Sequence, residues 1–309
     1  MQIQPTTYKD LPALRLTTSA LEAVLLPGQG GKIASLREKG GDFEYLWQRP
    51  GEIYRPLGVD TDYVEAECSG YDDMFPTIDP WKAISDSGDL LVYLDHGEVS
   101  RRPCVCAQEN GALRTETRLH CVPAVFRRTL REGQNGCLRI DFVIENLSDA
   151  PMDFLWAAHF LIRAVPGGRL LCPYPAGARV ELAFSHLPAF GKRNDRLAYP
   201  CWPDGSRLDE SREAGPDGNS WKYYFTDPLP GDTLGYQYPD GRRVTLRFDP
   251  DRTPYAGVWW CDGAPLPCHA FAPEVATGSF DRPDEARARG QFSVLPPRGQ
   301  YSFFLEIAL

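Results

Sequence analysis

The chain has 309 residues and a formal net charge of −9, with 42% hydrophobic and 24% charged residues. These proportions are typical of a globular protein and argue against disorder over most of its length. The negative charge, and the lack of a basic stripe interleaved with aromatic residues, argue against nucleic acids and anionic membranes as partners. We therefore expect a neutral or small polar ligand.

Short apolar or alternating runs, each typical of a β-strand, recur from one end of the chain to the other. Glycine and proline, with 28 residues of each, supply many turns between these runs. The predicted strands are Leu21–Leu26, Lys32–Arg37, Glu44–Trp47, Asp89–Leu94, Ala112–His120, Phe126–Leu130, Leu138–Glu145, Met152–Ile162, Thr233–Tyr238, Val244–Phe248, Tyr255–Trp260, Gly290–Leu295 and Gln300–Ala308.

Two hairpins are predicted from the turns between these runs. Leu138–Glu145 alternates clearly, and the turn that starts at Asn146 leads into Met152–Ile162. Tyr238–Arg242 contains Pro-Asp-Gly, a strong turn signal between two late strands.

Helical patterns are short, and two long stretches are irregular. Only Asp209–Ala214 and Asp284–Ala288 are helix candidates, each of one or two turns. Residues 50–88 and 185–232 read as long loops, which in a compact domain usually cover a binding site. We predict an all-β protein with one domain over residues 1–309, in which two large antiparallel sheets carry loops that close over one face.

The cysteines and the first residues of the chain bear on its location. Nine cysteines lie scattered without a regular framework, which is typical of a reduced, cytosolic protein. Met1–Leu11 has no basic or apolar segment of a signal peptide, and no apolar stretch approaches 18 residues. We expect a cytoplasmic protein, monomeric or homodimeric.

Two of the five histidines stand in contexts that suit chemistry. His159 lies inside the strongly apolar run Phe154–Phe160, and His96 lies beside a glycine in Leu94–Glu98. A core histidine bonded to a backbone carbonyl and a turn histidine are the structural alternatives. Because the free pKa of histidine is near 6.5, burial can also tune it as a general acid.

One glutamate and one tryptophan also stand out. Glu274 ends an apolar segment, where burial costs free energy unless the carboxylate is used, although a surface position at a strand end is equally open. Trp259 and Trp260 are consecutive in a strand and so point to opposite faces. An exposed indole would suit the apolar face of a sugar ring, but both could pack in the core.

Other polar residues allow several readings. Asp72, Asp73 and Asp79 lie in the first long loop, where turn formation is the common role of aspartate. Arg101 and Arg102 could hold an anion or could be a solvated pair. The cysteine and histidine spacings match no zinc site, and no glycine-rich loop opens a helix to bind phosphate, so no metal is predicted.

Five segments, taken in order, resemble the galactose mutarotase-like superfamily, and within it the aldose 1-epimerase-related proteins. They span nearly the whole chain, and each is short by itself. The segments are Gly30–Leu36 with Tyr45–Trp47, Ser69–Ile78, Asp95–Glu98, Glu145–Ser148 with Phe154–Phe160, and Tyr255–Trp259 with Phe271–Glu274.

The resemblance implies a large antiparallel β supersandwich that interconverts the α and β anomers of an aldose without a cofactor. It implies that Glu274 takes the proton of the anomeric hydroxyl and that His159 protonates the ring oxygen. His96 would bind a sugar hydroxyl or the ring oxygen. These roles agree with the free pKa values of the two residue types.

The aspartate that grips sugar hydroxyls in this family has no clear counterpart here. The candidates are Asp217, Asp227 and Asp232, with Lys222 as a substitute. The predicted site therefore consists of Glu274 and His159 as catalytic residues, with His96, Asp73, Lys222, Trp259 and Arg101 as sugar-binding residues.

Two alternatives remain beside the isomerase. A carbohydrate-binding or sensor protein on the same fold would bind a sugar without converting it. An epimerase of a phosphorylated or sulfonated sugar would use Arg101 and Arg102 for the anionic group.

Overall fold

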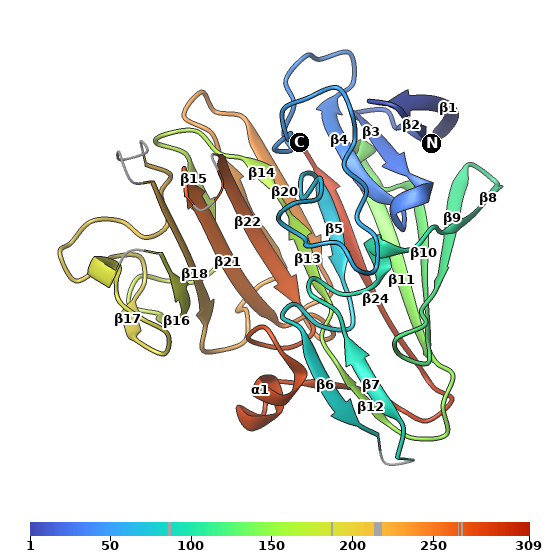
Figure 1. Cartoon of the computed structure of the whole chain (residues 1–309). Helices are drawn as coiled ribbons and strands as arrows, with labels where there is room; N and C mark the ends of the chain where they lie inside the picture. The colour runs from blue at the N-terminus through green and yellow to red at the C-terminus, as the bar shows by residue number, and fades with distance from the viewer. Residues whose placement is uncertain (86–87, 187, 213–217, 265, 267) are drawn as a thin grey trace.

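The computed structural model describes residues 1–85, 88–186, 188–212, 218–264, 266 and 268–309, which fold mainly into antiparallel β-sheets (Figure 1). The predicted all-β class is confirmed. Within the described residues, one short helix, α1 (Pro283–Ala288), accompanies the strands. Single 3₁₀ turns occur at Pro27–Gln29, Val99–Arg101, Gln134–Gly136 and Pro188–Phe190.

The larger sheet has twelve strands in the part of the chain that is described. Its spatial order is β1 (Gln2–Tyr8), β2 (Leu11–Thr17), β3 (Leu21–Leu26), β4 (Lys32–Glu38), β5 (Tyr71–Met74), β13 (Ala157–Phe160), β22 (His269–Ala276), β21 (Tyr255–Asp262), β18 (Asn219–Phe225), β16 (Arg179–Ser185) and β17 (Arg196–Ala198), while β14 (Ile162–Arg163) also pairs with β22.

Among the described residues, the smaller sheet has eight strands, and two further pairs stand apart from both sheets. The sheet runs in the order β15 (Arg169–Leu171), β19 (Thr233–Gln237), β20 (Arg243–Phe248), β24 (Gln300–Ala308), β11 (Leu138–Asn146), β10 (Ala124–Glu132), β9 (Ala112–Arg118) and β8 (Val105–Glu109). The separate pairs are β12 (Met152–Phe154) with β23 (Ser293–Leu295), and β6 (Trp81–Ile84) with β7 (Leu90–Tyr93).

The inner faces of the two large sheets share one apolar core. In β11, alternate residues from Leu138 to Asn146 are buried, as the sequence predicts. Tyr236 of β19 packs against Phe271 of β22, with ring centroids 5.2 Å apart. This contact joins the smaller sheet to the larger one, because side chains of facing sheets interdigitate.

The central strands of the larger sheet are buried on both faces. Every residue of β18 is buried, and so is every residue of β22 after His269. Trp221 and Tyr223 of β18 belong to the core, so Lys222 and Tyr224 point to the opposite face. Loops cover that outer face, and the candidate site lies between the loops and the sheet.

The predicted hairpin between Leu138–Glu145 and Met152–Ile162 is wrong. β11 pairs with β10 and β24, while residues 152–162 divide into β12, β13 and β14. The backbone N–H of Leu155 donates instead to the carbonyl of Pro76, and the chain crosses to the larger sheet. Residues 154–158 are all buried, and such an apolar run does not specify its pairing partner.

Other elements match the predictions in part. β3 and β24 have the predicted bounds, and Tyr238–Arg242 joins β19 to β20 as expected. Glu44–Trp47 forms only an isolated bridge at Leu46. The strands β1, β2, β5, β6, β8, β15, β16, β17 and β18 were missed.

The two predicted helices differ in outcome. Asp284–Ala288 is confirmed by α1, whereas residues 209–212 are not helical and 213–214 lie outside the described residues. In the described part of the chain, no helix is long and apolar enough to cross a membrane.

Candidate active site

His159 and Glu274 lie opposite each other on adjacent strands of the larger sheet. Ala157 of β13 pairs with Ala276 of β22, and the same antiparallel register continues into β14. This register sets His159 across from Glu274, since His159 follows Ala157 by two residues and Glu274 precedes Ala276 by two. Residues directly opposite in neighbouring strands share a face of the sheet.

The same cross-strand row continues on both sides of this pair. Gly257 of β21 faces Glu274, and Tyr224 of β18 faces Gly257. On the other side, Asp72 of β5 faces His159. Five consecutive strands thus present one line of side chains on the outer face of the sheet.

A cavity of about 330 Å³ lies over this row. Its volume falls within the range of small-molecule sites. The β-strands form its floor and the loops after β4, β5 and β7 form part of its wall. The lining residues are Tyr63, Val64, Cys68, Ile78, Asp79, His96, His159, Leu161, Ala183, Phe184, Arg193, Ser220, Lys222, Trp259, Leu266, Glu274 and Asp281.

Glu274 is almost fully buried at the end of β22. The Lys222 ammonium forms a buried ion pair with its Oε2 at 2.6 Å. Burial raises the pKa of Glu274 above its ordinary value, and Lys222 offsets only part of this effect. A carboxylate with a raised pKa is a stronger base than a solvated one.

Gly257 provides the space in which the Glu274 carboxylate sits. A Cβ atom at residue 257 would lie 3.1 Å from Glu274 Oε2 and 2.8 Å from the Tyr224 ring. The residue opposite Glu274 is therefore glycine for a steric reason.

Lys222 joins Glu274 to a second carboxylate, that of Asp281. The Lys222 Nζ lies 2.7 Å from Asp281 Oδ1, which also accepts a hydrogen bond of 2.7 Å from the Tyr224 hydroxyl. Burial opposes the charge of Lys222, but the two carboxylates outweigh it and raise the pKa of the ammonium. Lys222 is therefore held as a cation.

Asp281 was missed in the sequence analysis. It follows β22 in a loop with no apolar period or recognisable motif around it, so its sequence context carried no signal. The backbone N–H groups of Ile78 and Asp79 donate to the Asp281 carbonyl, which ties this loop to the loop after β5. The carboxylate thus reaches the cavity through a contact between distant segments.

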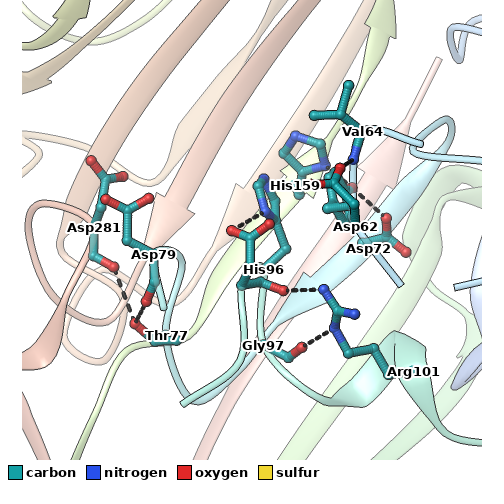
Figure 2. A network of polar contacts seen from close by, with 12 residues as sticks. Asp62, Val64, Asp72, Thr77, Asp79, His96, Gly97, Arg101, His159 and Asp281 are labelled. Atoms are coloured by element: carbon teal, nitrogen blue, oxygen red, sulfur yellow. Dashed lines mark hydrogen bonds and ion pairs between the residues drawn. The ribbon is translucent and has the colours of Figure 1, made fainter. Parts of the chain in front are cut away.

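Asp79 also lines the cavity, next to Asp281 (Figure 2). Its partial burial, together with the nearby Asp281, raises the pKa of Asp79. Asp79 was not among the site residues predicted from the sequence, since turn formation is the common role of aspartate in such a loop. Its carboxylate is available to accept a hydrogen bond from a bound hydroxyl.

His159 is buried at the floor of the cavity. Its Nδ1 lies 3.0 Å from the Tyr63 hydroxyl. Burial, together with the nearby His96, lowers the pKa of His159 well below the ordinary value of 6.5, although Asp72 opposes this shift. The imidazole is therefore neutral at neutral pH in the unliganded site.

The neutral state of His159 predicts a loss of stability in mild acid. The unfolded chain binds this proton near pH 6.5, but the folded protein binds it only at lower pH, so stability is lost as pH falls through 6.5. Between about pH 7.5 and about pH 5.5, we expect this group to lower the free energy of unfolding by up to ~1.4 kcal/mol per pH unit. Urea denaturation of wild type and His159→Gln at several pH values measures the slope of the free energy of unfolding against pH for each protein.

The exposed His120 provides the control for that experiment. We expect His120→Gln to retain the slope of the wild type, whereas His159→Gln has a smaller one. Equal slopes for wild type and His159→Gln would contradict a buried neutral imidazole.

His96 lies in the tight turn after β7 with a left-handed backbone (φ 55°). Its ring stacks on Tyr63 at 3.7 Å between centroids, and its Nδ1 lies 3.0 Å from the Asp95 carboxylate. Gly97 must follow it, because a Cβ there would lie 2.4 Å from the Phe75 carbonyl oxygen. The turn brings His96 beside His159 in the cavity wall (Figure 2).

Trp259 and Trp260 point to opposite faces of β21, as predicted. Trp260 is fully buried in the core, whereas Trp259 is partly exposed and lines the cavity. The Trp259 ring lies 6.5 Å from that of His159. It therefore offers an apolar surface beside the polar groups.

Asp73, predicted to bind sugar, lies away from the cavity. Its carboxylate forms a buried ion pair of 2.7 Å with Arg128 and accepts hydrogen bonds from Tyr71 and Trp156. Adjacent residues of β5 point to opposite faces, so Asp72 faces the loops and Asp73 faces the core. Asp73 is therefore placed in the core and not in the cavity. The sequence did not indicate this alternation, because residues 50–88, which include β5, were predicted to be a loop.

Arg101, also predicted to bind sugar, is engaged by the backbone. Its guanidinium donates to the carbonyl oxygens of Gly58, Thr61, Asp95 and Gly97, at 2.7, 2.7, 2.8 and 3.1 Å. Figure 2 shows the bond to Gly97. Arg101 lines a separate open groove of about 700 Å³, which lacks both His159 and Glu274. Its role here is to tie two loops together.

The remaining candidates for the hydroxyl-gripping residue also differ in position. Asp227 and Asp232 are not among the residues that line the cavity, and Asp217 lies outside the described residues. Lys222 does line it, in company with Asp281. Among the described residues, no group of three or more His, Cys, Asp or Glu side chains could hold a metal ion.

Comparisons with known proteins define the class of fold. No family model and no curated protein sequence matches the chain. A galactose mutarotase-like protein from Clostridium acetobutylicum has a TM-score of 0.66 at 13% identity, over 100% of this chain and 98% of that chain. A galactose mutarotase related enzyme from Lactobacillus acidophilus has a TM-score of 0.65 at 17% identity, over 96% and 97%.

A third match comes from C. elegans. An aldose epimerase homologue from C. elegans has a TM-score of 0.59 at 14% identity, over 94% of this chain and 95% of that chain. The chain therefore has the galactose mutarotase-like fold, and the predicted resemblance is confirmed at the level of fold. Function must be argued from the site, because one fold supports several activities.

Proposed function

We propose that this protein is an isomerase of the aldose 1-epimerase type, which interconverts the α and β anomers of a sugar. The observation that carries the proposal is the pairing of His159 and Glu274 in one cross-strand row beneath a single cavity. Opening a sugar ring requires one proton to leave the anomeric hydroxyl and another to reach the ring oxygen. Two titratable groups on one wall can perform both transfers.

In the proposed reaction, the Glu274 carboxylate takes the proton of the anomeric hydroxyl while the protonated form of His159, a small fraction at neutral pH, gives a proton to the ring oxygen. The bond between the anomeric carbon and the ring oxygen breaks, and the carbonyl forms. After rotation about the C1–C2 bond, both protons return and the ring closes on the other face. The low pKa of His159 makes its protonated form a strong acid.

The surrounding groups support a neutral sugar as the substrate. Trp259 offers an apolar surface, while Asp79, Asp281 and His96 offer hydrogen-bond partners for hydroxyl groups. Lys222 is already paired with carboxylates. The two arginines that suggested an anionic sugar are engaged outside the cavity, since Arg101 binds backbone carbonyls and Arg102 pairs with Glu98. Arg193, which does line the cavity, is paired with Glu285.

A second candidate function is sugar binding without conversion. The observation that favours it is the short contact between Lys222 and Glu274, because an engaged carboxylate is a weaker base. For either function, the nine free cysteines support a cytoplasmic location.

The test of the proposed function is the rate of anomer interconversion over a panel of neutral aldoses, measured by polarimetry or by NMR saturation exchange. We expect at least one neutral aldose to be accelerated, and its phosphorylated or sulfonated analogues to be poorer substrates. Binding of an aldose without acceleration would favour the second candidate. A preference for the anionic analogues would contradict the assignment of a neutral substrate.

A further inference from the structure

A chain of buried polar side chains extends from His159, with Tyr63 at the cavity wall and Asp72, Lys32 and Ser100 beyond it. The Tyr63 hydroxyl lies 3.0 Å from His159 Nδ1 and 2.8 Å from Asp72 Oδ2. Asp72 Oδ2 also receives the Lys32 ammonium at 3.0 Å, and Ser100 donates to Asp72 Oδ1 at 2.8 Å. All five residues are at least nine-tenths buried.

The protonation states of Asp72 and Tyr63 determine which atom donates in each hydrogen bond of this chain. The pKa of Asp72 is lowered because Lys32 and its other partners outweigh the effect of burial, so the carboxylate only accepts. Burial raises the pKa of Tyr63 well above its ordinary value, so the phenol keeps its single proton. That proton goes to Asp72, and the phenol oxygen can then only accept from His159.

We propose that Tyr63 and Asp72 are positioning residues that hold neutral His159 in its Nδ1–H tautomer. The Nε2 atom, which forms no hydrogen bond within the described residues, then carries the lone pair. If the proposed function is correct, Nε2 is the atom that exchanges a proton with the sugar. The partner of one ring nitrogen determines the state of the other.

Tyr63 also fixes the orientation of both histidines in the cavity. Its ring stacks on His96 with 2° between the planes and meets His159 edge-on, with centroids 5.7 Å apart. The two histidine rings lie 5.4 Å from each other. One side chain therefore positions both imidazoles and joins them to the buried Asp72.

The proposal is tested by the ¹⁵N signals of the imidazole rings, which distinguish a protonated from an unprotonated ring nitrogen. With five histidines, the signals of His159 are assigned by their loss in His159→Gln. Wild type, at a pH where the ring is neutral, is expected to show protonated Nδ1 and unprotonated Nε2. A wild-type ring protonated at Nε2 would overturn the proposal.

Tyr63→Phe removes the hydroxyl and with it the acceptor for Nδ1–H. We expect this variant to lose the Nδ1–H tautomer in favour of a mixture or of the Nε2–H form. Tyr71→Phe is the matched control, because Tyr71 is equally buried and donates to Asp73, on the opposite face of β5. An unchanged His159 tautomer in Tyr63→Phe would overturn the proposal, as would an equal change in the control.

Asp72→Asn tests the second positioning residue by a different route. The amide group of asparagine can donate to the Tyr63 oxygen, so the phenol proton turns towards His159 Nδ1 and the ring takes the Nε2–H form. Because Lys32 would lose its partner, thermal unfolding must first establish that the variant folds. If it does not fold, Tyr63→Phe still decides the question.

The tautomer measurement needs no sugar, so its failure is distinct from failure of the proposed function. Where an aldose is converted, Tyr63→Phe is expected to lower kcat more than it raises KM, by at most the 10²- to 10⁴-fold that general acid–base catalysis supplies. A tautomer change without any change in an established wild-type rate would contradict the assignment of Nε2 as the exchanging atom.

Discussion

Replacing Glu274 with glutamine is expected to slow the anomer interconversion by about 10²- to 10⁴-fold. Glutamine has nearly the same shape but cannot take the proton of the anomeric hydroxyl at neutral pH. Glu274 lies across from His159 on the floor of the cavity, and Lys222 would remain paired with Asp281 in the variant. Polarimetry on the best neutral aldose, with kcat and KM determined separately, measures the loss.

Glu181→Gln is a suitable control for this variant. Glu181 is also a buried glutamate of the larger sheet, but it pairs with Arg196 and Arg289 and does not line the cavity. We expect its interconversion rate to equal that of the wild type. If Glu274→Gln also retained the wild-type rate, Glu274 could not be the base, and the mechanism would have to be abandoned.

Replacing Asp73 with asparagine is expected to lower the free energy of unfolding by about 3–5 kcal/mol. The ion pair of 2.7 Å between Asp73 and Arg128 is inaccessible to solvent in the folded protein. The substitution therefore leaves the Arg128 guanidinium buried without its counter-charge. It also weakens the hydrogen bonds from Tyr71 and Trp156. Urea denaturation followed by tryptophan fluorescence measures the loss.

The same variant separates a structural from a sugar-binding role of Asp73. Folded Asp73→Asn is expected to keep the KM of the wild type, because Asp73 faces the core and not the cavity. Asp149→Asn is the control, since Asp149 forms an exposed pair with Arg298, and we expect its denaturation midpoint to be unchanged. A raised KM with unchanged stability would restore the sugar-binding role that the sequence suggested.

Several strands could be predicted because the positions of their hydrophobic residues match the positions that are buried. β11 alternates, one of its faces packs on the core, and its buried positions are those that the sequence indicates. The run Met152–Ile162 is apolar without alternation because β13 is covered on both faces. The apolar pattern predicts that this run forms strands. It does not predict which strands pair with it, because backbone hydrogen bonds between strands do not depend on a pattern of side chains.

The candidate site was predicted in part. His159, Glu274, His96, Lys222 and Trp259 do line one cavity, whereas Asp73 and Arg101 do not. The difference between Asp72 and Asp73 depends on the one-residue alternation of β5, a strand hidden in a stretch that resembled a loop. Tyr63, Asp79 and Asp281 reach the site from loops, and no local pattern indicates where a loop returns to the sheet.

By itself, the sequence determined the all-β class, most strand positions and the residue types available for proton transfer, because burial and turn formation are local properties of the chain. Only the tertiary structure decided that His159 faces Glu274, that Lys222 lies between two carboxylates, and that Tyr63 connects His159 to Asp72. These contacts join residues far apart in the chain, and they depend on strand register and loop closure, which are set by the packing of the whole molecule.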